Sequence, residues 1–335
     1  MEAVALRERL RAEALAMGFD VFGVAPVHAE VRADYFRQWI ADGMHGDMDW
    51  LAKNPERRTD ATRVLPEARS IIVVGLNYYQ PHPPAAYRIA KYALGADYHD
   101  VMLRRLKKLC GVMRTLGGDQ KPYVDTGPVL EKPLAAEAGL GWQGKSTILL
   151  QRGFGTWLFL GVILTTLELE PSPKAAHRCG TCTRCLDACP TAAIVAPYQL
   201  DARRCLAYLT IEHDGPIPEE FRRPLGDRVF GCDECLDVCP WNRWAKATQE
   251  ARFAPRALPD LRATLAWTDE QFVDHFRGTP VKRLGLRRWQ RNALTVLGNT
   301  GTAADLPAIR ALRGHADPMV AEHAQWAERE LIARG

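Results

Sequence analysis

The chain has 335 residues, of which 47% are hydrophobic and 25% are charged. This length allows two or three domains, and the composition is that of an ordinary globular protein. The net charge of +4 is too small for a polycation, so any binding of nucleic acid requires a local basic patch. We find no secretion signal, and the most apolar stretch, 154–167, is shorter than the roughly 20 residues that cross a bilayer. We therefore expect a cytoplasmic protein without a membrane segment.

The first half of the chain mixes helical and strand patterns without a regular βαβ rhythm. Apolar spacing predicts helices over 3–17, 97–116 and 131–138, and strands over 19–25, 70–76 and 122–124. Strand 70–76 is an unbroken apolar run, which is typical of a strand buried on both faces. A hairpin is expected to join strands 146–150 and 157–164. These elements predict that residues 1–170 form an α/β sandwich with a mixed sheet.

Proline-rich segments divide the rest of the chain. Pro171-Ser172-Pro173 separates the sandwich from the cysteine-rich region, which we assign to a ferredoxin-like domain over 171–250. Residues 251–335 are predicted to be mostly helical, and two of their helices share a similar pattern that resembles a HEAT-like repeat. A helical cap on the preceding domain is the alternative. The predicted fold class is therefore α+β, with three domains.

Eight of the nine cysteines form two runs, Cys179-x2-Cys182-x2-Cys185-x3-Cys189-Pro190 and Cys205 followed by Cys232-x2-Cys235-x3-Cys239-Pro240. This spacing is typical of ferredoxins with two [4Fe–4S] clusters, in which the last cysteine of a run ligates the other cluster. The first cluster is accordingly assigned to Cys179, Cys182, Cys185 and Cys239, and the second to Cys189, Cys205, Cys232 and Cys235. Zinc is the alternative, but structural zinc sites usually pair two short hooks across a longer loop.

A ninth cysteine and a glycine-rich segment suggest a metal ligand and a nucleotide site, but the sequence around them does not favour either role. Cys110 lies on the apolar stripe of helix 97–116 and is expected in the core. The segment 139–146 matches the phosphate-loop pattern G-x4-G-K-S, but a predicted helix precedes it and a strand follows. A phosphate loop requires the reverse order, so nucleotide triphosphate binding is not expected.

Several segments together resemble the epoxyqueuosine reductase family. They are Leu65-Pro-Glu-Ala-Arg-Ser70, Tyr123-Val-Asp-Thr-Gly-Pro128, Gly139-Leu-Gly-Trp-Gln-Gly-Lys145, Arg204-Cys-Leu-Ala-Tyr-Leu-Thr-Ile-Glu212 and the two Cys-Pro runs. The resemblance implies a reductase that converts epoxyqueuosine in the tRNA anticodon loop to queuosine. It further implies base-off cobalamin held between the N-terminal and cluster domains, and an external electron donor such as flavodoxin or ferredoxin.

The same resemblance implies the residues of the site. Asp125, directly after strand 122–124, is the expected catalytic residue, and a carboxylic acid with a raised pKa would suit it as a proton donor. An aspartate that only stabilises the turn is the alternative. The expected cobalamin contacts are Ser146, Leu149, Gln199, Leu206 and Tyr208, of which Leu206 and Tyr208 could instead belong to the core.

A basic run precedes the last helices. Its cationic residues are Lys282, Arg283, Arg287, Arg288 and Arg291, and such a density is typical of a phosphate-contacting surface. Trp289 could stack on an RNA base or could pack between helices. The family resemblance favours binding of the tRNA anticodon stem-loop, whereas a basic run alone is more often a solvated face.

Two other function classes remain open from the sequence. A corrinoid reductive dehalogenase also couples two clusters to cobalamin, but a basic helical tail would have no purpose there. A plain iron–sulfur electron-transfer protein would need no sandwich domain of about 170 residues.

Overall fold

A computed structural model describes residues 2–29 and 31–334. An antiparallel sheet with the strand order β1–β2–β7–β4 forms the centre of the N-terminal half. Its strands are β1 (Val21–Pro26), β2 (Ser70–Asn77), β4 (Gln120–Tyr123) and β7 (Leu158–Thr165). The predicted mixed sheet is therefore wrong. A helical crossover makes β2 and β4 run in the same direction, but β7 lies between them and runs the opposite way.

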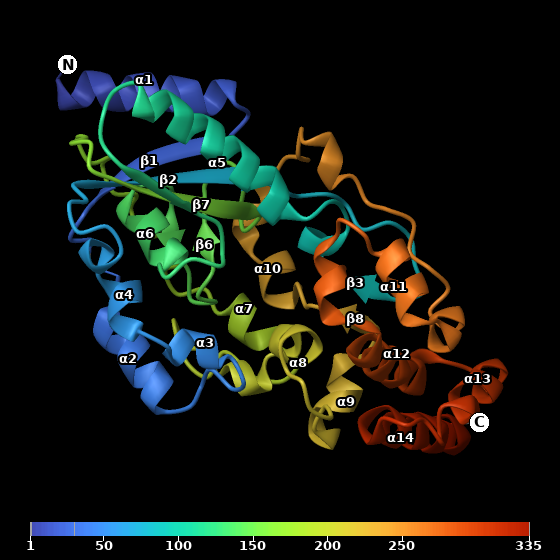
Figure 1. Cartoon of the computed structure of the whole chain (residues 1–335). Helices are drawn as coiled ribbons and strands as arrows, with labels where there is room; N and C mark the ends of the chain where they lie inside the picture. Colours follow the sequence, from blue (N-terminus) through green and yellow to red (C-terminus); the bar gives the residue numbers. More distant parts are fainter. Residues whose placement is uncertain (1, 30, 335) are drawn as a thin grey trace.

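Helices cover both faces of this sheet, as the predicted sandwich requires (Figure 1). Helices α1 (Ala3–Ala16) and α5 (Tyr98–Arg114) pack on one face, and α6 (Glu131–Glu137) packs on the other. Along β2, Ile72 and Val74 point toward α1 and α5, whereas Ile71 and Val73 point toward α6. Every residue of β2 is buried, which confirms its prediction. Cys110 of α5 is fully buried in the same core, also as predicted.

The predicted hairpin of 146–150 with 157–164 is wrong. Strand β6 (Leu149–Leu150) pairs instead with β5 (Trp142–Gln143), while β7 becomes a central strand. A tight turn causes this, because the Gly144 N–H donates to Ile148 O and the Thr147 N–H donates to Gly144 O. Lys145, in this turn, donates to the carbonyl oxygens of Gly180 and Cys182, at 2.8 and 3.0 Å. The lysine of the apparent phosphate loop therefore holds the cysteine-rich loop.

Short helices carry the cysteine-rich region. They are α7 (Arg184–Asp187), α8 (Leu206–Ile211), α9 (Glu219–Leu225) and α10 (Glu234–Asp237). Strand β8 (Arg228–Phe230) pairs in parallel with β3 (Arg88–Ile89), so the first half of the chain contributes a strand to this region. A second group of short helices follows β1, namely α2 (Ala33–Ala41), α3 (Asp49–Ala52) and α4 (Pro55–Thr59). In Figure 1 this group lies on the same side of the sheet as α6.

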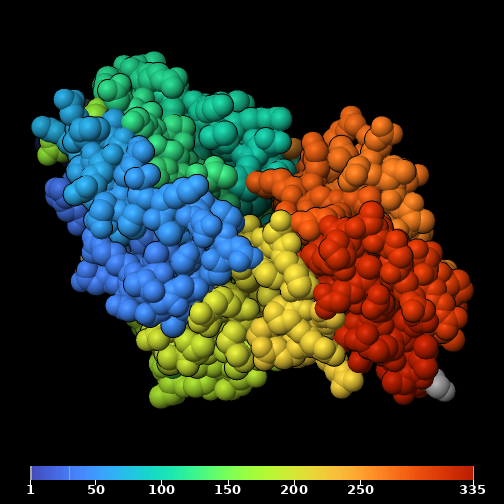
Figure 2. Space-filling model, turned by 60° about the horizontal axis from the view of Figure 1, so that its bottom comes forward, coloured from blue at the N-terminus to red at the C-terminus, as the bar shows by residue number. Residues whose placement is uncertain are grey.

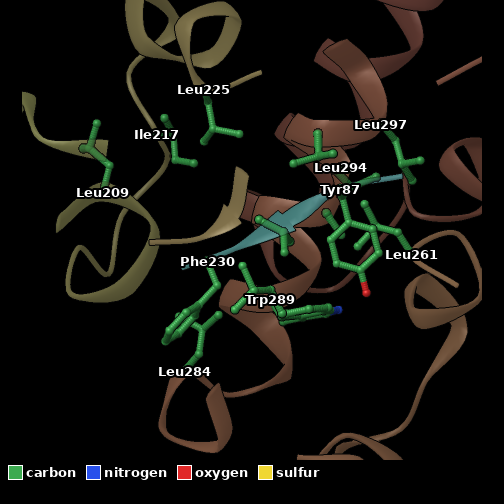
Figure 3. Packing of buried hydrophobic residues seen from close by; sticks show 14 of the residues in the cluster. Tyr87, Leu209, Ile217, Leu225, Phe230, Leu261, Leu284, Trp289, Leu294 and Leu297 are labelled. Carbon is green, nitrogen blue, oxygen red and sulfur yellow. The ribbon is translucent and has the colours of Figure 1, made fainter. Parts of the chain in front are cut away.

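The C-terminal helices share a hydrophobic core with the cysteine-rich region. They are α11 (Asp269–His275), α12 (Leu286–Thr300), α13 (Leu306–Ala311) and α14 (Pro318–Arg334). Figure 3 shows Trp289 of α12 beside Phe230 of β8 and Leu284, and all three belong to this core. The core therefore crosses the predicted boundary at residue 250. Within the described part of the chain, no helix combines the length and the apolar character needed to cross a bilayer.

Candidate active site and cysteine centres

The fold brings cysteines from the two runs together in two sets. Burial, which has the largest effect, and the neighbouring thiols of Cys179, Cys185 and Cys182 together raise the pKa of the Cys239 thiol to about 11. Helices α7 and α10, which begin next to these runs, contact each other. Cys239 thus lies with the three cysteines of the first run rather than with its own neighbours in sequence.

The second set shows the same crossing. Burial raises the pKa of the Cys235 thiol, and the thiols of Cys205, Cys232 and Cys189 add to this effect. Cys189, the last cysteine of the first run, is therefore close to the second run. Each set therefore contains cysteines of both runs, and a [4Fe–4S] cluster requires four such thiolates. The assignment of four cysteines to each cluster stays a prediction.

A cavity of about 880 Å³ lies between the sandwich and the other regions. Its wall combines residues of α2 and α3, the loop after β4, residues 211–212 and residues 280–288. In Figure 2 the blue segment that contains α2 and α3, the yellow segment near residue 210 and the red C-terminal helices meet on one face. The wall has both aromatic and charged side chains, as small-molecule sites commonly do.

Asp125 enters this cavity from the loop after β4. Its backbone has a left-handed φ of 58°, and its side chain is 65% exposed. The carboxylate lies 3.3 Å from Nε2 of His99. His99 Nδ1 lies 2.8 Å from Asp97, which caps α5 as predicted by accepting from the His99 N–H. Arg283 completes the group by donating to Asp97 at 3.0 Å.

The pKa of Asp125 differs from the expectation. Partial burial acts to raise this pKa, but the hydrogen bond from His99, the charge of His99 and a bond from Tyr98 lower it below its usual value. The predicted raised pKa is therefore wrong. His99 changes in the complementary direction, because its hydrogen bonds to Asp125 and Asp97 outweigh burial and raise its pKa. A proton of this pair therefore resides mainly on His99.

Glu131, the first residue of α6, is a second carboxyl group in the wall of the cavity. Its Oε1 atom is buried and has no hydrogen-bond partner among the residues that the structure describes. Burial and the charge of Asp125 raise its pKa to about 8, although the charges of Lys132 and Arg58 act to lower it. Glu131 is therefore protonated near pH 7. Neither His99 nor Glu131 was predicted as a site residue, although both lie in helices that the sequence predicts.

The cavity adjoins the second cysteine set. Lys132 lines the cavity, and its charge reaches the thiol of Cys205 and lowers the pKa that burial raises. Phe230, another lining residue, precedes Cys232 by one glycine in the chain. A cluster bound by this set would therefore lie next to the cavity.

The five expected cobalamin contacts do not line this cavity. Leu206 and Tyr208 are buried in the core shared with the C-terminal helices, and the Tyr208 hydroxyl accepts from the Asp47 N–H at 2.7 Å. Ser146 and Leu149 are buried as well, and Gln199 is exposed elsewhere. The cavity is lined instead by their neighbours Gln143, Thr147 and Leu200. The five contacts stay predictions, and the three lining residues belong to the same segments.

The basic run divides into surface and interior residues. Arg283 and Arg288 line the cavity, and Lys282 and Arg287 lie nearby in sequence with their side chains accessible. Arg291 is 0% exposed and donates to the carbonyl oxygens of Leu209, His213 and Gly215. The prediction that Arg291 contacts RNA is therefore wrong. Trp289 is also 0% exposed, so it packs between helices rather than stacking on a base.

These features define a class, namely an iron–sulfur oxidoreductase with a separate reaction cavity. Residues 178–242 match the family described as "4Fe-4S double cluster binding domain", and residues 58–126 match "Epoxyqueuosine reductase QueG, DUF1730". The epoxyqueuosine reductase of Xanthomonas campestris pv. campestris is 42% identical over 95% of this chain and 94% of that protein. That of Pseudomonas aeruginosa is 40% identical over 93% and 91%.

A solved structure extends the likeness to the fold. The crystal structure of an epoxyqueuosine reductase with an epoxyqueuosine-modified tRNA-Tyr stem loop superposes with a TM-score of 0.92. It is 29% identical, and the match covers 98% of this chain and 90% of the other. The chain belongs to the epoxyqueuosine reductase family.

Proposed function

We propose that this chain reduces epoxyqueuosine in the tRNA anticodon loop to queuosine, with electrons that pass through two [4Fe–4S] clusters to bound cobalamin. The observation that carries the proposal is the cavity in which Asp125, His99 and Glu131 lie next to a buried cysteine set. Conversion of an epoxide to an alkene and water takes two electrons and two protons. This site combines groups that can donate protons with an adjacent electron path.

The cysteine sets are proposed as the cluster ligands. Cys179, Cys182, Cys185 and Cys239 hold the first cluster, and Cys189, Cys205, Cys232 and Cys235 hold the second. The mutual proximity of the thiols within each set supports this assignment. The second cluster lies nearer the cavity, because Cys205 is close to Lys132.

Cobalamin is the proposed resident of the inner part of the cavity. The size of the cavity and its partly apolar wall suit a large, flat cofactor. Gln143, Thr147 and Leu200 would hold the corrin. His99 is engaged by Asp97 and Asp125 and would therefore not be free to ligate cobalt. When bound and reduced, cobalamin supplies a strongly reducing centre that can deliver two electrons.

The protein supplies the protons. His99 holds one proton in its hydrogen bond with Asp125, and Asp125 passes that proton to the alkoxide as the epoxide opens. Glu131 holds the second proton, which the oxygen needs to leave as water. In the solved enzyme of Bacillus subtilis a catalytic aspartate loop is swung out of the active site. Asp125 likewise lies on a loop with its side chain largely exposed.

The basic residues at the cavity hold the RNA. Lys282, Arg283, Arg287 and Arg288 are proposed to contact phosphates of the anticodon stem-loop, because cations placed there compensate the charge of the strand that enters the cavity. The complex of a related enzyme with a modified tRNA stem loop supports tRNA as the partner. The C-terminal helices carry or adjoin these residues. We propose that α12 and α14 form a HEAT-like pair that helps to bind the tRNA.

The test is a conversion assay without oxygen. Protein reconstituted with iron, sulfide and cobalamin is incubated with dithionite and tRNA that contains epoxyqueuosine, and the nucleosides are separated after digestion. We expect queuosine to replace epoxyqueuosine, with no conversion when cobalamin is omitted. An intact epoxide in the complete mixture would refute the proposal, and so would protein that contains zinc without acid-labile sulfide.

A further inference from the structure

The two cysteine sets differ in the exposure of the residues beside their cysteines. Leu206, Gly231 and Leu236, which adjoin cysteines of the set beside the cavity, are buried. The loop of the first set is open, because Arg178, Gly180, Thr181 and Thr183, which flank its cysteines, are all exposed. Electrons from outside must therefore enter through the first set and leave through the second.

A surface groove reaches the first set directly. The groove is lined by residues of both Cys-Pro runs, including Arg184, Ala188, Cys239, Asn242 and Arg243. A cluster ligand thus forms part of the floor of an open surface feature. A partner bound in the groove would therefore be separated from the first cluster by little more than the side chain of Cys239.

Exposed arginines lie at this groove and beside the first set. Arg184 and Arg243 line the groove, and Arg178 directly precedes Cys179. The structure pairs none of the three with a carboxylate of residues 2–29 or 31–334. The groove also contains two acidic residues. Asp237 is paired with Lys91 at 2.7 Å, whereas Asp187 accepts only from the neutral hydroxyl of Thr183 at 2.8 Å. The three arginines outnumber the one carboxylate without a cationic partner, so the surface has a net positive charge.

An aromatic residue stands beside the charges. Trp244 is 39% exposed, which is high for a tryptophan. The Arg243 guanidinium lies 3.7 Å from the centroid of its ring, and Trp241 packs behind it at 4.9 Å between centroids. Tryptophan and arginine are the residue types that most often dominate the binding energy of protein interfaces.

We propose that Arg178, Arg184, Arg243 and Trp244 form the docking surface for a small acidic electron-transfer protein of low potential, a flavoprotein or a ferredoxin. The inference rests on the proposed function and adds the place at which electrons enter. Each docking event transfers one electron, so that the donor is oxidised and the first cluster is reduced. Two events supply the two electrons that remove the epoxide oxygen. An RNA ligand fits this surface less well, since it would gain nothing from a cluster on the floor of the groove.

The test compares two reductants on the same holoenzyme. The variant carries Arg178→Glu, Arg184→Glu and Arg243→Glu, and its matched control carries Arg9→Glu and Arg11→Glu on the exposed face of α1. With reduced flavodoxin as the donor, we expect kcat/KM of the variant to fall roughly tenfold or more, because the introduced carboxylates repel an acidic donor and slow association. The kcat/KM of the variant should also no longer decrease as the salt concentration rises. With dithionite, which needs no docking surface, turnover should equal that of the wild type.

Three results would overturn the docking surface. Unchanged kcat/KM with flavodoxin would show that the donor binds elsewhere. An equal loss with dithionite would show that the arginines act on the cluster itself. Weaker tRNA binding with unchanged flavodoxin kinetics at saturating tRNA would assign the surface to RNA. A wild-type enzyme that leaves the epoxide intact with dithionite would refute the proposed function instead, so the two failures are distinct.

Discussion

The imidazole Nε2 of His99 lies 3.3 Å from the Asp125 carboxylate, although the two residues come from the first turn of α5 and the loop after β4. Each alters the acidity of the other, since the pair raises the pKa of His99 and lowers that of Asp125. The pair therefore works as one unit that holds a proton at the cavity.

Asp125→Asn should remove most of the activity and little else. The substitution keeps the size of the side chain but breaks the proton path from His99, and we expect turnover to fall roughly 10²- to 10⁴-fold, the usual contribution of a positioned acid or base. Cluster absorbance and corrin binding should remain, as measured by visible spectra. Asp119→Asn, on the exposed loop before β4, is the control. Wild-type turnover in Asp125→Asn would remove this residue from the mechanism.

Glu131→Gln should change the pH profile. The wild-type single-turnover rate should fall as the pH rises through about 8, because Glu131 then loses the proton that it donates. In the variant the rate should be roughly 10²-fold lower and lack this alkaline limb. Glu137→Gln, at the other end of α6 and paired with Lys174, is the matched control. An alkaline limb that persists in Glu131→Gln would assign the titration to another group.

Glu131→Gln should also change how the stability of the folded protein depends on pH. The folded protein binds a proton at Glu131 up to about pH 8, whereas the unfolded chain releases it near the ordinary value of 4.5. The stability of the wild type should therefore decrease from about pH 4.5 to 8 through this group. Glu131→Gln should lack this component, so its thermal midpoint relative to the wild type should rise across that range.

Cluster ligation can be tested with pairs of cysteine variants. Cys239→Ala combined with Cys185→Ala should lose no more iron than either single variant, because both cysteines are assigned to the first cluster. Cys239→Ala combined with Cys235→Ala should lose the iron of both clusters, although these two cysteines are neighbours in sequence. The measurement is iron and acid-labile sulfide per chain after anaerobic reconstitution. The opposite result would indicate ligation within each run.

Lys282→Ala with Arg287→Ala should weaken tRNA binding in a salt-dependent way. Each lost phosphate contact should reduce the slope of log Kd against log salt by about one. The control is Lys107→Ala with Lys108→Ala, two exposed cations on α5. If the slope of the first variant equalled that of the wild type, the RNA would have to bind elsewhere.

Arg291→Met should act on stability rather than on RNA. The fully buried guanidinium donates to three carbonyl oxygens, one in a buried and two in part-buried hydrogen bonds. Loss of these bonds should cost about 3 kcal/mol in the free energy of unfolding. Denaturant titration would measure this cost, and the salt slope of RNA binding should stay at the wild-type value. A stable variant with a reduced slope would restore Arg291 to the RNA surface.

Sequence patterns predicted elements whose signal is local. The apolar run of β2, the cap at Asp97 and the burial of Cys110 follow from spacing within a few residues, and all three are confirmed. The direction of β7 was not predictable in this way, because its partners β2 and β4 are both distant in sequence. Sheet order depends on such long-range pairing, which periodicity does not encode.

The site was predictable only in part for the same reason. Asp125 was found from its motif, and it lies in the cavity. His99 and Glu131 carry no motif of their own, and their importance appears only when the fold brings α5, α6 and the loop after β4 together. Arg291 was predicted on the surface because it belongs to a basic run, but its position on the helix places its side chain in the interior.

The core that α12 shares with the cysteine-rich region would link metal content to RNA recognition if both proposed assignments hold. Cys205 and Cys232 pack against this core, and the helix that begins at Leu286 carries Arg287 and Arg288 on its first turn. Loss of the proposed second cluster through oxygen damage would thus withdraw support from the basic residues as well. A chain that can no longer transfer electrons would then release its tRNA, leaving the unreduced substrate free for an intact copy.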